Sequence, residues 1–365
     1  MVFDNLNQGS TSSLNSQDLA ANDSNLRSET SQGITGYPLE NLLTSLRLNG
    51  LRNLIETEAR YLGRKSYSVL SEPPSDNTQL FDPSESKVLL SPEKDSEGHW
   101  VGGASPFYDE ENNKTYLYYR LRDPYKRGWK SVIAGVEGNE LNTLAEFYSE
   151  EFSAHSLEGA ALTKENQNYS LFISYHEKSS GRWKIDKLTA DSVSKLESAT
   201  RETVEISPSK FHVKDPIIYE GEIIVHAASK YFFTISNLAV EKPYSSSEPE
   251  EVLFRRGTSG LRVTSILDIG DETFYFYDWH PSIIFTGEEK AKIGRLEDGR
   301  IKGLMPDSAI TSEDGTGSLR YVKAIKVEDE VWFFYEKSAP GKSHELALHK
   351  MSLQEAKNRL TGLSK

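Results

Sequence analysis

The pattern of hydrophobic and polar positions changes along this chain. Residues 1–36 are rich in Ser, Asn, Gln and Asp and have few apolar positions, which predicts a disordered tail. Residues 37–66 carry leucines at helical spacing and predict a helical segment. From residue 80 to 352, short aromatic and β-branched runs alternate with turns rich in Gly, Asn and Asp, which is typical of an all-β domain. Residues 353–365 predict a short C-terminal helix and tail.

Five segments of the β region share one plan: a small or polar start, a strand, a turn, and an aromatic return strand. They are "GGASPFYDEENNKTYLYYRL" (102–121), "LEGAALTKENQNYSLFISYH" (157–176), "VKDPIIYEGEIIVHAAS" (213–229), "LRVTSILDIGDETFYFYDWH" (261–280) and "LRYVKAIKVEDEVWFFYEKS" (319–338). Pro106, Ala161, Pro216, Ser265 and Ala324 align in the five segments, at spacings of 55, 55, 49 and 59 residues. One four-stranded sheet cannot bury both of its faces, so such units must stack. Radial stacking predicts a five-bladed β-propeller, here with an N-terminal helical extension.

The innermost strand of each blade would start at one mouth of a central channel. Ionisable residues stand at four of these five starts: Glu158, Asp215, Arg262 and Arg320. Acids and arginines that converge on one axis predict a polar site at this mouth. The alternative is that they form salt bridges between blades and only close the ring.

Three motifs resemble the five-bladed propeller glycosidases, the group that contains arabinanases, β-xylosidases, fructan-cleaving enzymes and mannoside phosphorylases. "VKDPIIYEGEIIV" resembles their Asp-Pro start followed by a Gly turn, and "LEGAALTKENQNYSLFISY" resembles their Glu-Gly start. "YLYYRLRDPYKRGWKSVIAGV" resembles a first-blade strand that runs into a loop. The resemblance covers about residues 98–352. It implies a five-bladed propeller that cleaves a glycosidic bond in an oligosaccharide or smaller carbohydrate.

Glycoside hydrolysis uses two carboxyl groups, one that protonates the leaving oxygen and one that activates water or attacks the sugar. Glu158 is the candidate acid, because its small and apolar neighbours would desolvate it and raise its pKa. Asp215, which Pro216 holds extended, is the candidate base or modulator of the acid's pKa. Asp278, after the aromatic run "FYFY", is the third candidate.

One position departs from the resemblance, because Ser105 stands where arabinanase-like propellers carry a first-blade Asp as the base. Three alternatives follow. Asp215 or Asp278 substitutes for the base; the protein is a glycoside phosphorylase in which inorganic phosphate attacks; or it is a non-catalytic propeller that binds sugars or proteins. Cations near the mouth would bind phosphate or a substrate carboxylate, or would pair with the acids. They are Arg120, Arg122, Lys214, Arg262, Arg320 and Lys323.

Three further residues are candidates for substrate binding. Trp183 and Tyr321 would stack on sugar faces if they lie at the mouth, although most aromatic residues in a propeller pack between blades. His344 belongs to the loop "YEKSAPGKSHEL" and would bind a hydroxyl or phosphate group.

Composition narrows the classes of partner. The net charge of −13 disfavours binding to nucleic acids and anionic membranes. No cysteine is present, which excludes disulfides and thiolate metal sites. The N-terminus lacks the pattern of a secretory signal and no run is long enough for a membrane helix, so a cytoplasmic location is expected. No motif for nucleotide binding, serine-esterase or zinc-protease chemistry occurs. The sequence identifies no cofactor and no metal ligand, and a cation in the central channel, as in some members of the family it resembles, stays open.

Overall fold

The computed structural model describes residues 80–204, 211–229, 236–240, 251–254, 260–279, 289–305 and 308–363. The predicted disordered tail over 1–36 and the predicted helical segment over 37–66 lie outside the described residues. The described part is built almost entirely of β-strands, so the all-β prediction is confirmed. Its helices are short: η1 (Pro83–Glu85), η2 (Val193–Ser198) and α3 (Leu353–Gly362).

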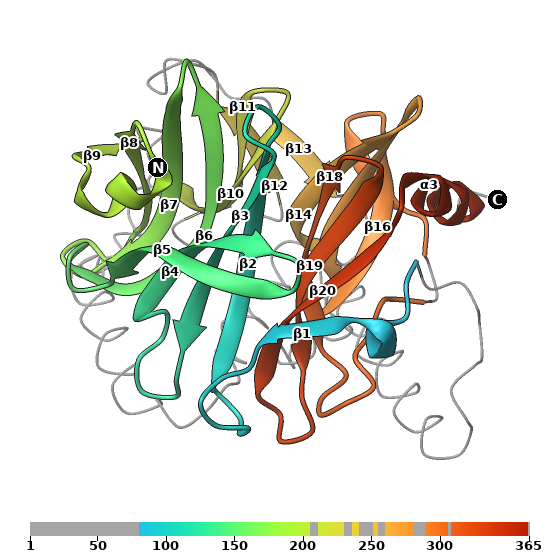
Figure 1. Cartoon of the computed structure of the whole chain (residues 1–365), viewed down its shortest axis with the longest axis horizontal. Coiled ribbons are helices and arrows are strands. Elements are labelled where there is room, and N and C mark those ends of the chain that lie inside the picture. Colours follow the sequence, from blue (N-terminus) through green and yellow to red (C-terminus); the bar gives the residue numbers. More distant parts are fainter. Residues whose placement is uncertain are drawn as a thin grey trace, which may run out of the picture. The chain divides into compact units, whose positions relative to one another are not determined.

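Within the described residues the strands form five antiparallel groups that follow one another along the chain (Figure 1). The first two groups are β2 (Trp100–Asp109), β3 (Lys114–Arg122), β4 (Lys130–Glu137) and β5 (Glu140–Tyr148), then β6 (Ala154–Glu165), β7 (Asn168–Glu177), β8 (Trp183–Ala190) and β9 (Arg201–Thr203). The next two are β10 (Phe211–Tyr219), β11 (Glu222–Ser229), β12 (Ser236–Val240) and β13 (Glu251–Phe254), then β14 (Gly260–Ile269), β15 (Glu272–Trp279), β16 (Lys290–Glu297) and β17 (Arg300–Gly303). The fifth is β18 (Leu319–Val327), β19 (Glu330–Ser338), β20 (His344–Ser352) and β1 (Lys87–Leu90).

Tight turns explain why the sequence folds into hairpins. The chain reverses at Asn166–Gln167 between β6 and β7, at Glu220–Gly221 between β10 and β11, and at Asp298–Gly299 between β16 and β17. All six residues have φ between 49° and 79°. Two-residue turns of this kind match the twist of the flanking strands and fix the register of the pair.

The first strands of the five groups, β2, β6, β10, β14 and β18, are called the inner strands. They contact one another in cyclic order, since β2 also contacts β18. The fifth group is completed by β1, which precedes all the others in sequence and pairs with β20 through Lys87–Leu348 and Val88–Ala347 (Figure 1). The start and the end of the β region are therefore fastened together in one sheet.

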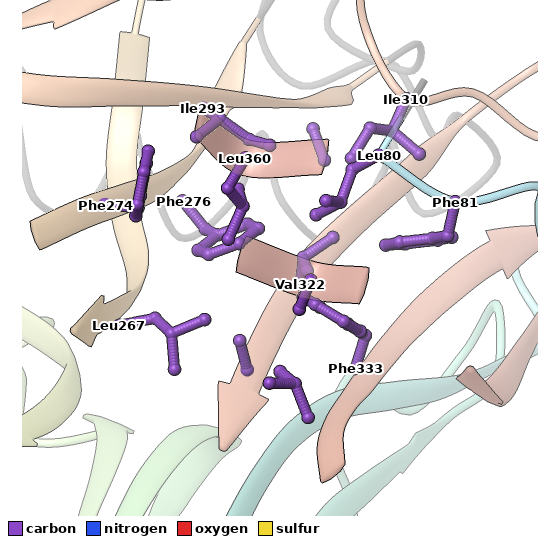
Figure 2. Close-up of a cluster of buried hydrophobic side chains, with 14 of the residues drawn as sticks. Leu80, Phe81, Leu267, Phe274, Phe276, Ile293, Ile310, Val322, Phe333 and Leu360 are labelled. Carbon is purple, nitrogen blue, oxygen red and sulfur yellow. The ribbon is translucent and has the colours of Figure 1, made fainter. Parts of the chain in front are cut away.

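Buried apolar side chains from separate strands pack between the groups. In the cluster of Figure 2, Phe274 and Phe276 come from β15, Val322 from β18, Phe333 from β19 and Leu360 from α3, and each is fully buried. Removing such a side chain from water contributes about 1.5–3 kcal/mol. The second strands of the groups, such as β7 and β19, are buried at nearly every position, so both faces of these sheets are covered, as stacked sheets require.

Candidate active site

Each inner strand loses its regular pairing with the second strand of its group near its start, and β6 and β14 do so at one further place. The interruptions lie at Gly102–Ser105 in β2, Leu157–Ala160 in β6, Lys214–Ile217 in β10, Val263–Ser265 in β14 and Arg320–Lys323 in β18. Such β-bulges leave residues unpaired, turn their side chains away from the regular pleat and are frequent beside active sites. Glu158, Asp215 and Tyr321 are bulge residues, so three of the predicted site residues owe their direction to this shared feature.

Two of the bulge residues have an uncommon backbone conformation. Asp215 has φ of 52° and Tyr321 has φ of 54°, in the left-handed region that side chains other than Gly seldom adopt. Hydrogen bonds hold both: the Asp215 N–H donates to Ser174 Oγ at 3.2 Å, and the Tyr321 N–H donates to Asp278 Oδ1 at 3.0 Å. Backbone strain of this kind concentrates at functional sites.

The second strand of each group places an ionisable side chain opposite the start of the inner strand. The pairs are Gly102–Arg120, Ser156–His176, Lys214–His226, Arg262–Asp278 and Arg320–Glu336. Arg120 and Asp278 are among the residues predicted from sequence, whereas His176, His226 and Glu336 are not. A signal for them exists, because an ionisable residue follows the apolar run of every second strand: "YLYYR", "LFISYH", "IIVH", "FYFYD" and "WFFYE".

Glu158 is fully buried and held by two arginines. Arg120 donates to Oε2, and Arg127 Nε donates to Oε1 at 3.1 Å. The Tyr118 hydroxyl donates to the backbone carbonyl of Glu158 at 2.6 Å. Burial raises the pKa of Glu158, but the attraction of Arg120, Arg127 and Lys214 outweighs it and lowers the pKa to about 2. The prediction that the pKa of Glu158 is raised was therefore wrong, because its charged partners stand on β3 and the following loop rather than beside it in sequence.

Asp215 lies next to Glu158 through the backbone of Gly159, whose N–H donates to Asp215 Oδ1 at 3.1 Å. Lys214 Nζ is 3.6 Å and Arg262 Nε 3.9 Å from Oδ2, which accepts no hydrogen bond from the described residues. Burial raises the pKa of Asp215, but the attraction of Lys214 and Arg262 lowers it by a larger amount, so the net shift of the pKa is downward. Asp215 is an ionised carboxylate at neutral pH.

Asp278 has the opposite protonation preference. Its carboxyl is fully buried, accepts the Tyr321 N–H, and has Arg262 Nε at 2.8 Å from Oδ2. Burial and the neighbouring Glu289 raise its pKa to about 7 despite the attraction of Arg262. Arg262 also donates to Glu289 at 3.0 Å, so it is shared between acids.

Glu336, which the sequence analysis did not identify as a site residue, contacts three residues of the site. Its Oε1 accepts from Arg320 Nε at 2.7 Å and lies 2.6 Å from His344 Nδ1, and its Oε2 accepts the Gly103 N–H at 3.2 Å. Burial raises its pKa, but Arg320 and His344 reverse this and the net shift is downward. Burial lowers the pKa of His344. His344 is therefore a buried partner of Glu336 rather than a loop residue free to bind substrate.

Tyr321 is surrounded by arginines. Its ring centroid lies 4.0 Å from the Arg262 guanidinium carbon and 5.5 Å from those of Arg120 and Arg320. Arg120 also donates to its hydroxyl at 3.4 Å. The attraction of cations to an aromatic face holds the three guanidinium groups around one ring. The structure thus places seven of the predicted residues close to one another: Arg120, Glu158, Asp215, Arg262, Asp278, Arg320 and Tyr321.

A small cavity lies among these groups, here called the central cavity. Its wall includes Gly159, Asp215, Arg262, Tyr321 and Lys323. Its volume of about 10 Å³ is room for one water molecule. Four of the five inner strands provide these residues, so the wall is made of side chains that are far apart in the sequence.

The two remaining predicted residues, Trp183 and Arg122, do not line the central cavity but contact residues near it. Trp183 stacks on His176 with ring centroids 4.9 Å apart, and Lys214 Nζ lies 5.1 Å from the Trp183 ring. The Arg122 guanidinium lies 4.0 Å from the ring of Trp100. Burial and the repulsion of neighbouring arginines lower the pKa of Arg122 to about 9. Their predicted roles in substrate binding stay predictions.

In the described part of the chain, no set of three or more His, Asp and Glu side chains is placed to hold a metal ion. None of the described helices has the length and apolar character needed to cross a membrane.

Comparison with known proteins places the fold. No protein-family model and no curated protein sequence matches the chain. Among solved structures, a GH43_1 enzyme from Xanthomonas citri complexed with xylose has a TM-score of 0.53 at 8% identity, over 73% of this chain and 90% of that one. The RS223 β-xylosidase has a TM-score of 0.52 at 10% identity, over 73% and 95%. The arabinanase Arb43A from Bacillus subtilis has 0.50 at 9% identity, over 73% and 98%. The described chain thus shares the β-propeller fold of these GH43 proteins.

Proposed function

We propose that the protein is a glycoside hydrolase on a five-bladed propeller, with the central cavity as the deepest part of its active site. The blade count is supported by the five antiparallel groups and the cyclic contacts of the inner strands. It is also supported by the pairing of β1 with β20, which fastens the first and last parts of the domain as ring closure requires.

The observation that carries the proposal is the Asp215 carboxylate. It stands on a strained bulge, lines the central cavity, and turns toward it an ionised group whose Oδ2 accepts no hydrogen bond from the described residues. A buried carboxylate that is ionised and has one oxygen without a hydrogen bond from the described residues is placed to accept a proton from water or a sugar hydroxyl, and the pairing cations that keep it ionised also make it a weaker base. In the proposed reaction Asp215 acts as the base.

Glu158 takes a different part from the one expected of it. Because Arg120 is buried beside it and keeps it ionised, it is unsuited to donate a proton at neutral pH. Its second partner, Arg127, has a side chain that is 52% exposed. Displacement of Arg127 by a ligand would free Oε1 to accept a hydrogen bond from a sugar hydroxyl, so Glu158 is proposed to bind substrate.

The fold neighbours suggest the sugars to test first. One is a complex with xylose, one is named a β-xylosidase and one an arabinanase. We therefore propose pentose glycosides as the substrate class. Inorganic phosphate is not favoured as the attacking group, because Arg262 and Arg320 are already engaged by carboxylates.

A non-catalytic propeller is the second candidate, and one observation favours it. Glu158 is paired with two arginines and the central cavity has room for one water molecule, so substrate binding requires side chains at the cavity to move. A binding protein for sugars or proteins has no need of such an opening.

Activity assays separate the two candidates. Wild-type protein would be incubated with aryl β-xylosides, aryl α-arabinofuranosides, xylo-oligosaccharides and arabinan, with and without phosphate. Hydrolysis that Asp215→Asn lowers by at least about 10²-fold, without a need for phosphate, is the expected result. The matched control is Asp109→Asn, since Asp109 is also a buried carboxylate and pairs with Lys164 at the far end of β2. Equal inertness of wild type and Asp215→Asn on every sugar would refute the hydrolase and favour the binding protein.

A further inference from the structure

The central cavity contains a buried amine that pairs with no acid of the described residues. Lys323 on β18 is 9% exposed and lines the cavity. Four other cations of the site each have a carboxylate within 4.0 Å: Arg120 has Glu158, Lys214 has Asp215, Arg262 has Asp278 and Arg320 has Glu336. Lys323 makes no ion pair or hydrogen bond with the described residues.

Burying an ammonium group without a partner is costly, and such a group either loses its proton or is matched by a ligand. Three charged groups face Lys323: Asp215 from β10, Asp278 from β15 and Arg262 from β14. Both acids act from beyond ion-pair distance, and Arg262 repels. Burial is the largest effect and lowers the pKa of Lys323 to about 7. The amine therefore exchanges its proton in the range where most enzymes work.

Asp215 and Lys323 stand on the wall of the same cavity, and neither is saturated. Oδ2 of Asp215 accepts no hydrogen bond from the described residues, and Nζ of Lys323 donates none to them. A hydroxyl or ether oxygen in this cavity would meet a proton acceptor on one side and a proton donor on the other. Glu158, the carboxyl expected to be the acid, is held ionised by its arginines.

We propose that Lys323 is the proton donor to the glycosidic oxygen and acts together with Asp215 as the base, an inference that rests on the proposed hydrolase function. The Lys323 ammonium gives its proton to the glycosidic oxygen as the bond from this oxygen to the anomeric carbon breaks, and the leaving group departs as an alcohol. Water bonds to the anomeric carbon and gives its proton to the Asp215 carboxylate. Asp215 then releases that proton to solvent, and the neutral amine of Lys323 takes one up.

Leaving-group dependence tests this role directly. Phenyl and 2,4-dinitrophenyl β-xylosides would be compared, with the corresponding α-arabinofuranosides as a second pair. A dinitrophenolate departs without protonation, whereas a phenolate benefits from it, so Lys323→Met is expected to lower kcat on the phenyl glycoside about 10²–10⁴-fold and on the dinitrophenyl glycoside far less. Lys323→Arg keeps the charge but holds its proton too tightly, and is expected to behave like Lys323→Met. Equal losses on both leaving groups would overturn the proposal.

The pH profile and a control variant give independent readouts. Wild-type activity should fall as pH rises through about 7, where Lys323 loses its proton, and Lys323→Met should lack this limb while Asp278→Asn keeps it. Lys164→Met is the control, because its side chain is also 9% exposed but pairs with Asp109 and Glu111. It should keep the wild-type profile.

Titration of the free protein separates this proposal from the hydrolase proposal. With lysine labelled at Cε, NMR should show one amine with a midpoint near pH 7 that is missing in Lys323→Met. A midpoint for Lys323 near 10 would overturn the proton-donor role even if the protein is a hydrolase. Wild-type inertness on every glycoside would overturn both proposals, whereas full activity of Lys323→Met on phenyl glycosides would overturn this one alone.

Discussion

Removing Arg120 tests whether the buried ion pairs stabilise the site. In Arg120→Met, Glu158 stays fully buried, and its one remaining ion-pair partner among the described residues is Arg127, whose side chain is 52% exposed. Burial alone would raise the pKa of Glu158, and the attraction of Arg120, Arg127 and Lys214 reverses this effect and lowers the pKa to about 2. Breaking a buried pair by removing one partner costs about 3–5 kcal/mol. We therefore expect Arg120→Met to lose about 3 kcal/mol in the free energy of unfolding at pH 7.

The assay is urea unfolding followed by tryptophan fluorescence, with Lys195→Met as the control. Lys195 pairs with Asp191 at 2.8 Å, but both side chains are 64% exposed, and such a solvent-screened pair contributes little to stability. Without Arg120, burial should raise the pKa of Glu158, so the deficit should shrink between pH 7 and pH 5. Adding Glu158→Gln to Arg120→Met should recover part of the loss. A loss no larger than that of Lys195→Met, or one unchanged at pH 5, would refute the reasoning.

Three further predictions concern the same framework. Gly102→Ala should lower the melting temperature by several degrees, because a Cβ there would overlap the Glu336 carboxylate, whereas Gly135→Ala has ordinary contacts and should change it little. Stability should fall as pH drops below about 4.5, because the pKa values of Glu158 and Glu336 are lowered in the folded state and their contribution is present only above the unfolded value; thermal melts that stay constant to pH 3 would contradict this. Val88→Pro should remove pairing between β1 and β20 and speed hydrogen exchange in β20, and unchanged protection there would show that β1 does not fasten the sheet.

The hairpins were predictable because their causes are local. A turn such as Asn166–Gln167 between an apolar strand and an aromatic strand specifies the pair from within about 20 residues of sequence. The recurrence of that plan also predicted that the units stack. The pairing of β1 with β20 was not predicted, because Val88 and Ala347 are distant in the chain and a four-residue strand has no distinctive pattern of its own.

The site was predicted less completely, for a related reason. Glu158 and Asp215 were found because they stand at the start of recurring strands. The pKa of Glu158 was misjudged because the decisive partner, Arg120, belongs to another group, and charge is felt through space rather than along the chain. Glu336 was missed because it sits at the end of an aromatic strand, where an acid is usually a solvated residue, and only the register with Arg320 shows that it is buried.

The buried ion pairs around the central cavity are an argument that these residues do more than stabilise the fold. Buried ion pairs cost desolvation energy, and well-packed apolar residues of similar volume serve stability as well or better. Here the ion pairs lie at β-bulges, and Asp215 and Tyr321 have strained backbone conformations. The energetic costs of backbone strain and of charge desolvation therefore fall at the same place in the fold. Arg120, Arg262 and Arg320 are each matched by an acid, which balances most of the charge, yet Lys323 on the cavity wall has no ion-pair partner among the described residues. A stabilising network has no use for one unmatched amine, whereas a site that moves protons does.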